Sequence, residues 1–145
     1  MGLSVEERLQ RLEDVEAIRR LMLDYRRCLD AKDIRGYAEL FAAEGEFVAG
    51  DMRATGPQVI FELVDGMRGT LLTDRGGDDV HIVANPTIDV DGDRATADSM
   101  WIYIVRGEGD VPVLSKIGSY HDVLTREDGR WRFLRREAPT IIPAL

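Results

Sequence analysis

DVEAIRRLMLDYRRCLDAKDIRGYAELF, residues Asp14–Phe41, is the stretch of sequence that decides the fold. On a helix of about 100° per residue, its apolar residues fall within an arc of about 140°, which predicts one buried stripe. The stripe consists of Val15, Ile18, Leu21, Met22, Tyr25, Cys28 and Leu29. The Tyr25 ring can pack in a core while its hydroxyl needs a polar partner, so a partly polar cavity is expected near this end of the helix.

Asp30 lies about 140° from Tyr25 on the helical wheel, so it can face the interior only if the helix ends there. The polar run 30–33 and Gly36 indicate such an end, and Asp33 is a good N-cap for a second helix, Ile34–Ala42. From periodicity alone, the more ordinary interpretation of Asp30 is a solvated acid in an interhelical turn.

The rest of the chain changes from a helical period to a period of two at Val80. Before that point, we expect a short strand at Glu46–Ala49, another at Met52–Ala54, a helix at Gln58–Met67 that follows Pro57, and a loop at Gly69–Asp79. After it, we expect strands at Val80–Val90, Arg94–Val105, Val113–Thr125 and Trp131–Ala138, with hairpin turns at 91–92 and 127–129. The apolar tail, residues 139–145, should pack against a cavity mouth or a neighbouring subunit. Helices followed by antiparallel strands predict an α+β domain that spans residues 1–145.

Composition limits the classes of partner. The 145 residues, 44% hydrophobic and 32% charged, suffice for one well-cored domain. A net charge of −8 argues against nucleic acid and anionic membranes as partners, because both need a concentrated basic surface. The N-terminus has no apolar signal region and no apolar run is long enough to span a bilayer, so we expect a cytoplasmic protein. The one cysteine, Cys28, is expected to be an inert core thiol.

Motifs for metal, phosphate or covalent chemistry are weak. Asp89–Asp93 has calcium-loop letters with the wrong glycine position, and a hairpin turn explains it better. His81 and His121 are too far apart in sequence to predict a metal site, and His121 is expected at the surface or at an interface. We therefore expect no metal and no cofactor, and the acid–base candidates are Tyr25, Asp30 and His81.

The sequence resembles the SnoaL-like branch of the nuclear transport factor 2-like superfamily from Asp14 to about Arg136. The resemblance rests on Ile18–Asp30, Asp33, Leu40-Phe41, HIVANPTIDVDGDRATA at His81–Ala97, GSYHD at Gly118–Asp122 and DGRW at Asp128–Trp131. In these motifs it is most similar to the branch that contains bile acid 7α-dehydratase and scytalone dehydratase. The bile acid enzymes carry an arginine after the last strand where this chain has Thr140, so bile acid specificity is not implied.

The resemblance implies a cone-shaped α+β barrel, in which a curved mixed or antiparallel sheet wraps around N-terminal helices and leaves a deep apolar pocket. It also implies a homodimer or higher homo-oligomer. In such a pocket His81 would be the general base, Asp30 the carboxylate that orients its ring, and Tyr25 a donor to a substrate oxygen. Further expected contacts to a small apolar cyclic substrate are Trp101, Tyr103, Tyr120, Phe61 and Arg136.

Three functions are compatible with these residues. The first is a cofactor-independent lyase, of the dehydratase or dehydrohalogenase type, that uses the Asp30–His81 dyad. The second is an isomerase or polyketide cyclase with a carboxylate as its main acid or base, whose activity would survive loss of His81 better than loss of Asp30. The third is a non-catalytic module that binds a small molecule or another protein, since one fold hosts many activities.

Overall fold

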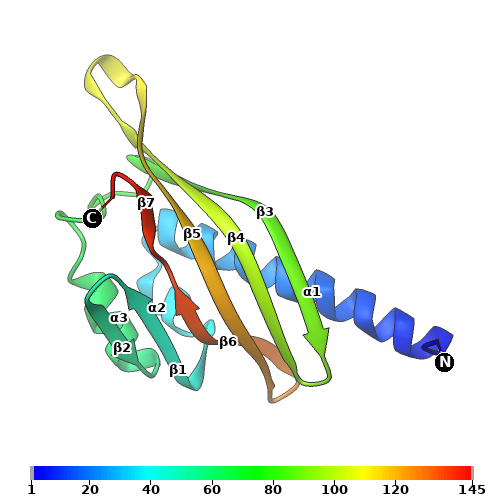
Figure 1. The fold of residues 1–145 in the computed structure, drawn as a ribbon. Helices are drawn as coiled ribbons and strands as arrows, with labels where there is room; N and C mark the ends of the chain where they lie inside the picture. The colour runs from blue at the N-terminus through cyan, green and yellow to red at the C-terminus, as the bar shows by residue number, and fades with distance from the viewer. Residues whose placement is uncertain (1, 145) are drawn as a thin grey trace.

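Residues 2–144, which the computed structural model describes, form three α-helices, one 3₁₀ turn and a seven-stranded sheet (Figure 1). The helices are α1 (Val5–Asp30), α2 (Ile34–Ala38) and α3 (Pro57–Asp65), and the 3₁₀ turn is η1 (Glu108–Asp110). The strands are β1 (Phe41–Ala49), β2 (Met52–Thr55), β3 (Asp79–Asp91), β4 (Arg94–Arg106), β5 (Pro112–Glu127), β6 (Arg130–Glu137) and β7 (Thr140–Ile142).

The sheet has the order β2-β1-β6-β5-β4-β3, and β7 pairs with β5. Neighbouring strands are antiparallel except β1 and β6, which are parallel, so the sheet is mixed. Figure 1 shows α1 lying across one face of the curved sheet. The predicted α+β class is confirmed, but β2 and β3 are edge strands, so the barrel stays open. Within residues 2–144, no helix has the length and apolar character that crossing a bilayer requires.

Helix α1 begins with a capping box. Ser4 Oγ accepts a hydrogen bond from the Glu7 N–H, and the Glu7 carboxylate accepts one from the Ser4 N–H. Most of the predicted stripe is buried against the sheet, but Cys28 is only partly buried and its thiol lies 4.0 Å from the Asp33 carboxylate. The expectation of a core thiol is therefore wrong, because Cys28 lies at the edge of the stripe, beside the turn that leads to α2.

The second helix is shorter than its sequence predicts. Asp33 caps it as expected, through a 2.9 Å hydrogen bond from the Gly36 N–H, but α2 ends at Ala38 rather than Ala42. The Leu40 carbonyl accepts a hydrogen bond from the Phe133 N–H, and Phe41 pairs with Phe133 in the parallel ladder between β1 and β6. Strand pairing thus overrides the weak helical preference of this short apolar run.

The C-terminal tail packs on β5, next to a close contact between a glycine and a tryptophan. Strand β7 pairs with β5 at Ile117 and Gly118, and the Pro139 carbonyl accepts a hydrogen bond from the Ser119 N–H. Trp101 is directly opposite Gly118 in the ladder, and its indole occupies the space that a side chain at position 118 would need.

We predict that Gly118→Ala destabilises the fold. A Cβ at this position would lie 2.1 Å from the Trp101 ring and 2.4 Å from the Pro139 carbonyl oxygen, which is backbone and cannot rotate away. Overpacking of this kind costs about 1–3 kcal/mol or more, measurable as a lower free energy of unfolding in urea. Gly2→Ala, at a position with open space around it, should change that value by less than about 0.5 kcal/mol. Equal stability of the two variants would contradict the packing assignment.

Candidate active site

A cavity of about 130 Å³ lies between α1 and the inner face of the sheet. Its walls combine aromatic and aliphatic side chains with a few polar groups. The lining residues are Tyr25, Leu29, Tyr37, Phe47, Ala49, Val64, Met67, Leu71, Leu72, His81, Trp101, Tyr103, Lys116, Tyr120, Ala138 and Thr140. Leu71 is 47% exposed, so the cavity reaches the surface beside the loop that follows α3.

Asp30 and His81 meet at one side of this cavity. The Asp30 Oδ1 atom lies 2.7 Å from His81 Nδ1, and the same carboxylate accepts a hydrogen bond from the His81 backbone N–H at 3.0 Å. Arg26 Nη1 donates to Asp30 Oδ2 at 3.2 Å. The side chains of His81 and Asp30 are 8% and 14% exposed, so the contact is shielded from bulk water.

The contact fixes which ring nitrogen of His81 is available. A carboxylate only accepts hydrogen bonds, so the imidazole places its proton on Nδ1 and keeps a lone pair on Nε2. The Asp30 charge also stabilises the imidazolium that forms when Nε2 takes a proton. The pair is therefore arranged as a base with an orienting carboxylate.

A second ion pair holds the two segments that carry the dyad. Lys32 Nζ lies 2.6 Å from Asp79 Oδ1, and both side chains are at most 6% exposed. Tyr103 donates its hydroxyl to Asp79 Oδ2 at 2.8 Å, while its ring lies against the His81 ring at a centroid distance of 4.7 Å. Lys32 is two residues after Asp30, and Asp79 is two residues before His81. The Lys32–Asp79 ion pair therefore restrains the segment that carries Asp30 and the segment that carries His81.

Asp79 keeps its charge although it is buried. Burial raises the pKa of its carboxyl, but hydrogen bonds from Lys32, Tyr103 and the Thr73 N–H outweigh burial and leave the pKa below its usual value. Burial and the bond to Asp79 raise the pKa of Tyr103 well above its usual value, so this phenol keeps its proton as the donor.

The inner end of the cavity is formed by tyrosines over a buried ion pair. Tyr25 and Tyr37 share a 2.7 Å hydrogen bond between their hydroxyls. Arg136, 0% exposed, binds the Asp122 carboxylate through two 2.7 Å hydrogen bonds, and its guanidinium lies 3.8 Å from the Tyr120 ring centroid and 4.1 Å from that of Tyr25. Burial raises the pKa of Tyr25, Tyr37 and Tyr120, so these phenols stay protonated. One of the Tyr25 and Tyr37 hydroxyls uses its proton in their shared hydrogen bond, so the other hydroxyl can donate to an oxygen in the cavity.

Most of the site residues expected from the sequence reach the cavity. Its walls include Tyr25, His81, Trp101, Tyr103 and Tyr120, whose roles stay predictions. Three others do not line it. Asp30 reaches the cavity only through its contact with His81. The Phe61 ring is covered by the Arg35 guanidinium at 3.8 Å, and Arg136 lies behind the tyrosines with its charge already bound by Asp122.

The sequence pattern did not single out Tyr37, Lys32, Asp79 or Lys116. Tyr37 belongs to the short helix α2 and Lys32 to the connection before it, and the positions of both are set by tertiary contacts. Asp79 was assigned to a loop. Lys116 could have been found, because it has the same strand parity as Tyr120 and therefore shares its face of β5.

His121 lies at the surface, on the side of β5 opposite Tyr120. Its Nδ1 is 2.6 Å from Asp98 and its Nε2 is 3.2 Å from Ser119 Oγ, an order that resembles a serine hydrolase triad. However, the side chains of His121 and Asp98 are 53% and 68% exposed, and the Ser119 N–H already donates to the Pro139 carbonyl. An oxyanion that formed here would be solvated by bulk water and would have no fixed hydrogen-bond donor. We therefore assign no catalytic role to Ser119, His121 and Asp98.

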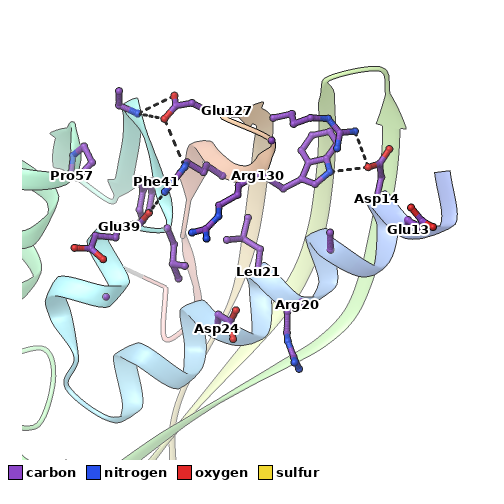
Figure 2. A pocket seen from close by; sticks show the side chains of 18 of the residues that line it. Glu13, Asp14, Arg20, Leu21, Asp24, Glu39, Phe41, Pro57, Glu127 and Arg130 are labelled. Carbon is purple, nitrogen blue, oxygen red and sulfur yellow. Dashed lines mark hydrogen bonds and ion pairs between the residues drawn. The ribbon is translucent and has the colours of Figure 1, made fainter. Parts of the chain in front are cut away.

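A larger groove, about 820 Å³, lies between α1, β1 and the β5–β6 hairpin, away from the dyad (Figure 2). The polar groups that Figure 2 connects by dashed lines are occupied by internal contacts: Asp14 accepts from Arg126 and Trp131, and Glu127 accepts from the Ala43 N–H. Burial raises the pKa of Asp14, but its three side-chain hydrogen bonds prevail and leave the pKa lowered. The contacts of Asp14 fix α1 to the β5–β6 hairpin.

Side chains that could bind a metal ion do not cluster in the described part of the chain. Among residues 2–144, no three histidine, cysteine, aspartate or glutamate side chains are close enough together to hold a metal ion.

We predict that Asp79→Asn destabilises the protein in a pH-dependent way. The variant leaves the buried Lys32 charge unpaired, which costs about 3 kcal/mol near pH 7. Because the pKa of Asp79 is lower in the folded state than the unfolded value of about 3.9, the pair stabilises fully above about pH 5 and progressively less as pH falls below about 4. Urea unfolding at several pH values should thus show the difference between wild type and variant shrinking in acid.

The neighbouring Asp78→Asn is the matched control. Asp78 pairs with Arg106 at the surface, where an ion pair contributes at most about 1 kcal/mol. Two results would contradict the role of Asp79 in restraining the two segments. One is a loss of unfolding free energy for Asp78→Asn as large as that for Asp79→Asn, and the other is a difference between wild type and Asp79→Asn that does not depend on pH.

Comparison with known proteins agrees with the fold. A family model described as a SnoaL-like domain matches residues 10–137. Among solved structures, a nuclear transport factor 2-like protein with a cystatin-like fold from Novosphingobium aromaticivorans is similar at 27% identity, with a TM-score of 0.85, over 99% of this chain and 94% of that one. A candidate scytalone dehydratase from the same organism is similar at 31% identity, with a TM-score of 0.75, over 91% of this chain and 87% of that one.

A third structure, that of a Mycobacterium tuberculosis protein whose function is described as unknown, shares the fold at 22% identity. Its TM-score is 0.80, and the match covers 91% of this chain and 74% of that one. Comparison with functionally curated proteins gives no match. The family match over most of the chain, together with the helix-and-sheet architecture, shows that this protein belongs to the SnoaL-like domain family of the nuclear transport factor 2-like superfamily.

Proposed function

We propose that this protein is a cofactor-independent acid–base enzyme, a lyase of the dehydratase or dehydrohalogenase type that acts on a small, mostly apolar cyclic substrate. The observation that carries the proposal is the shielded 2.7 Å contact between Asp30 and His81 at the wall of an aromatic cavity. The 31% identity to a candidate scytalone dehydratase supports the same reaction class.

The proposed reaction begins with a proton transfer. His81 Nε2 removes a proton from the ring carbon next to the one that carries the leaving group, and a carbonyl on the other side of that carbon makes its C–H acidic. The electron pair of that C–H bond forms the new C=C bond, and the bond to the hydroxyl or halide breaks. Asp30 stabilises the resulting imidazolium, which returns its proton to a departing hydroxide as water, or to solvent when the leaving group is a halide ion.

Tyr25 would assist by donating a hydrogen bond to a substrate oxygen. Its phenol is protonated because burial raises the pKa, and its bond to Tyr37 holds it at the inner end of the cavity. Hydrogen bonds from fixed donors in a site with little water stabilise developing negative charge more than they would in solution. The cavity is close to the roughly 150 Å³ that holds a benzene molecule, which suits a single-ring substrate.

The test is a panel of single-ring compounds with a hydroxyl or halogen two bonds from an acidic C–H, assayed for enone absorbance and for halide release. We predict turnover by the wild type and a loss of about 10²–10⁴-fold in kcat for His81→Gln and for Asp30→Asn. His121→Gln is the matched control, because it removes an exposed histidine that also contacts an aspartate, and its activity should match that of wild type.

The outcome also separates the reaction types. Activity that survives His81→Gln but not Asp30→Asn would replace the lyase assignment with an isomerase or cyclase that uses the carboxylate. Unchanged turnover in both variants, or no turnover of any compound by folded wild type, would overturn the proposal. Circular dichroism checks that each variant is folded.

A further inference from the structure

Lys116 is the one lysine or arginine among the cavity-lining residues that the structure describes. It is partly buried, and within residues 2–144 no carboxylate lies within 4 Å of its ammonium. The other charges around the cavity are compensated: Asp30 contacts Arg26, Lys32 pairs with Asp79, and Arg136 pairs with Asp122. The ammonium of Lys116 is therefore the charged group at the cavity that remains available to bind a ligand.

Strand register places Lys116 opposite the dyad across the cavity wall. His81 on β3 pairs with Tyr103 on β4, and Tyr103 pairs with Lys116 on β5. Directly opposite residues share a face of the sheet, so these three side chains form one row on the inner face. Neighbouring strands are about 4.8 Å apart, so the row spans about 10 Å with the Tyr103 ring at its centre.

A local irregularity on β5 lies next to this row. After the pair Tyr103–Lys116, the next pair is Ile104 with Leu114, so Ser115 is an extra residue on β5. Lys116 faces inward with the strand parity of Tyr120, and the bulge shifts the alternation of side chains beyond it, so that Leu114, two residues earlier, is 57% exposed.

On the inner face of β5, the positions beyond Lys116 offer no further charge to an anion. Gly118 has no side chain and is covered by the Trp101 indole, and Tyr120 belongs to the closed inner end. A ring between His81 and Trp101 would thus have its reacting carbon near the imidazole and a substituent near the mouth, at Lys116.

We propose that the substrate carries an anionic group, such as a carboxylate, on its ring, and that Lys116 binds this group. The proposal rests on the proposed function only for the role of His81, since binding of an anion at Lys116 needs no catalysis. Lys116 is a specificity-determining residue in this scheme. The structural alternative is a lysine that covers apolar wall with its methylene chain and leaves its ammonium in water.

Benzoate and benzamide are the probes, because they have the same shape and only benzoate is charged near neutral pH. Ligand-observed NMR titration should show wild type binding benzoate about tenfold more tightly than benzamide, as expected for a charge-assisted hydrogen bond. Lys116→Met keeps the methylene chain and removes the charge, so it should abolish this preference and change benzamide affinity less than about twofold. Lys116→Arg should restore the preference.

Two further variants separate the causes of such a preference. Arg94→Met removes the same charge from an exposed position at the far end of β4 and should leave the benzoate preference intact. His81→Gln should also keep the preference, so failure of the lyase proposal and failure of this one are distinguishable. Equal affinities of wild type for the two probes, no binding of either, or an equal effect of Lys116→Met and Arg94→Met would overturn the proposal.

Discussion

A carboxylate–imidazole hydrogen bond and an ion pair join the end of α1 to the beginning of β3, and the geometry of the site depends on both. Asp30 contacts His81, and Lys32 contacts Asp79, so each segment contributes one member to each pair. In the part of the chain that the structure describes, no backbone ladder joins the end of this helix to β3, so side chains must set the distance between them. Asp30 and Lys32 supply that restraint with His81 and Asp79, and the Asp30 carboxylate also accepts a hydrogen bond from the His81 backbone N–H.

Charged side chains in the interior occur as ion pairs. Asp14 with Arg126, Asp79 with Lys32, and Asp122 with Arg136 each place a carboxylate beside a cation and give it further hydrogen-bond donors or aromatic neighbours. Burying a charge costs desolvation free energy, and an unpaired charge has no ion pair or hydrogen bond to offset that cost. Charges among the described residues are therefore buried only as pairs. The cavity accordingly has apolar and aromatic walls, with polar groups at separate, defined points.

The sequence predicts the long elements well because their patterns are strong. The strands after Val80 and the hairpin turn at Gly92 follow from local chemistry and the period of two, and the structure confirms them. The error at Leu40–Ala42 arose because a short apolar run suits a helix or a strand equally well, and pairing with β6 decides between them.

The candidate site was accessible from the sequence only in part. Asp30 and His81 are 51 residues apart, and helical periodicity on its own favoured a solvated Asp30, so the family resemblance was needed to pair them. Phe61 and Arg136 were assigned to the pocket from residue type, which does not tell a cavity wall from the layer behind it. Lys32 and Asp79 depend on the path of a turn and a loop, which no local pattern specifies.

The Arg136–Asp122 pair also sets how the cavity can adapt. Three aromatic rings, those of Tyr25, Tyr120 and Phe133, lie within 4.2 Å of the guanidinium carbon, and the ion pair behind them is fully buried. Moving these rings would uncover a bound charge, whereas Met67 and Leu72 near the mouth can change rotamer at little cost. The inner end of the pocket is thus rigid and its entrance is adaptable. Substitutions near the entrance should therefore change the size of ligand that this fold accepts more easily than substitutions at the inner end.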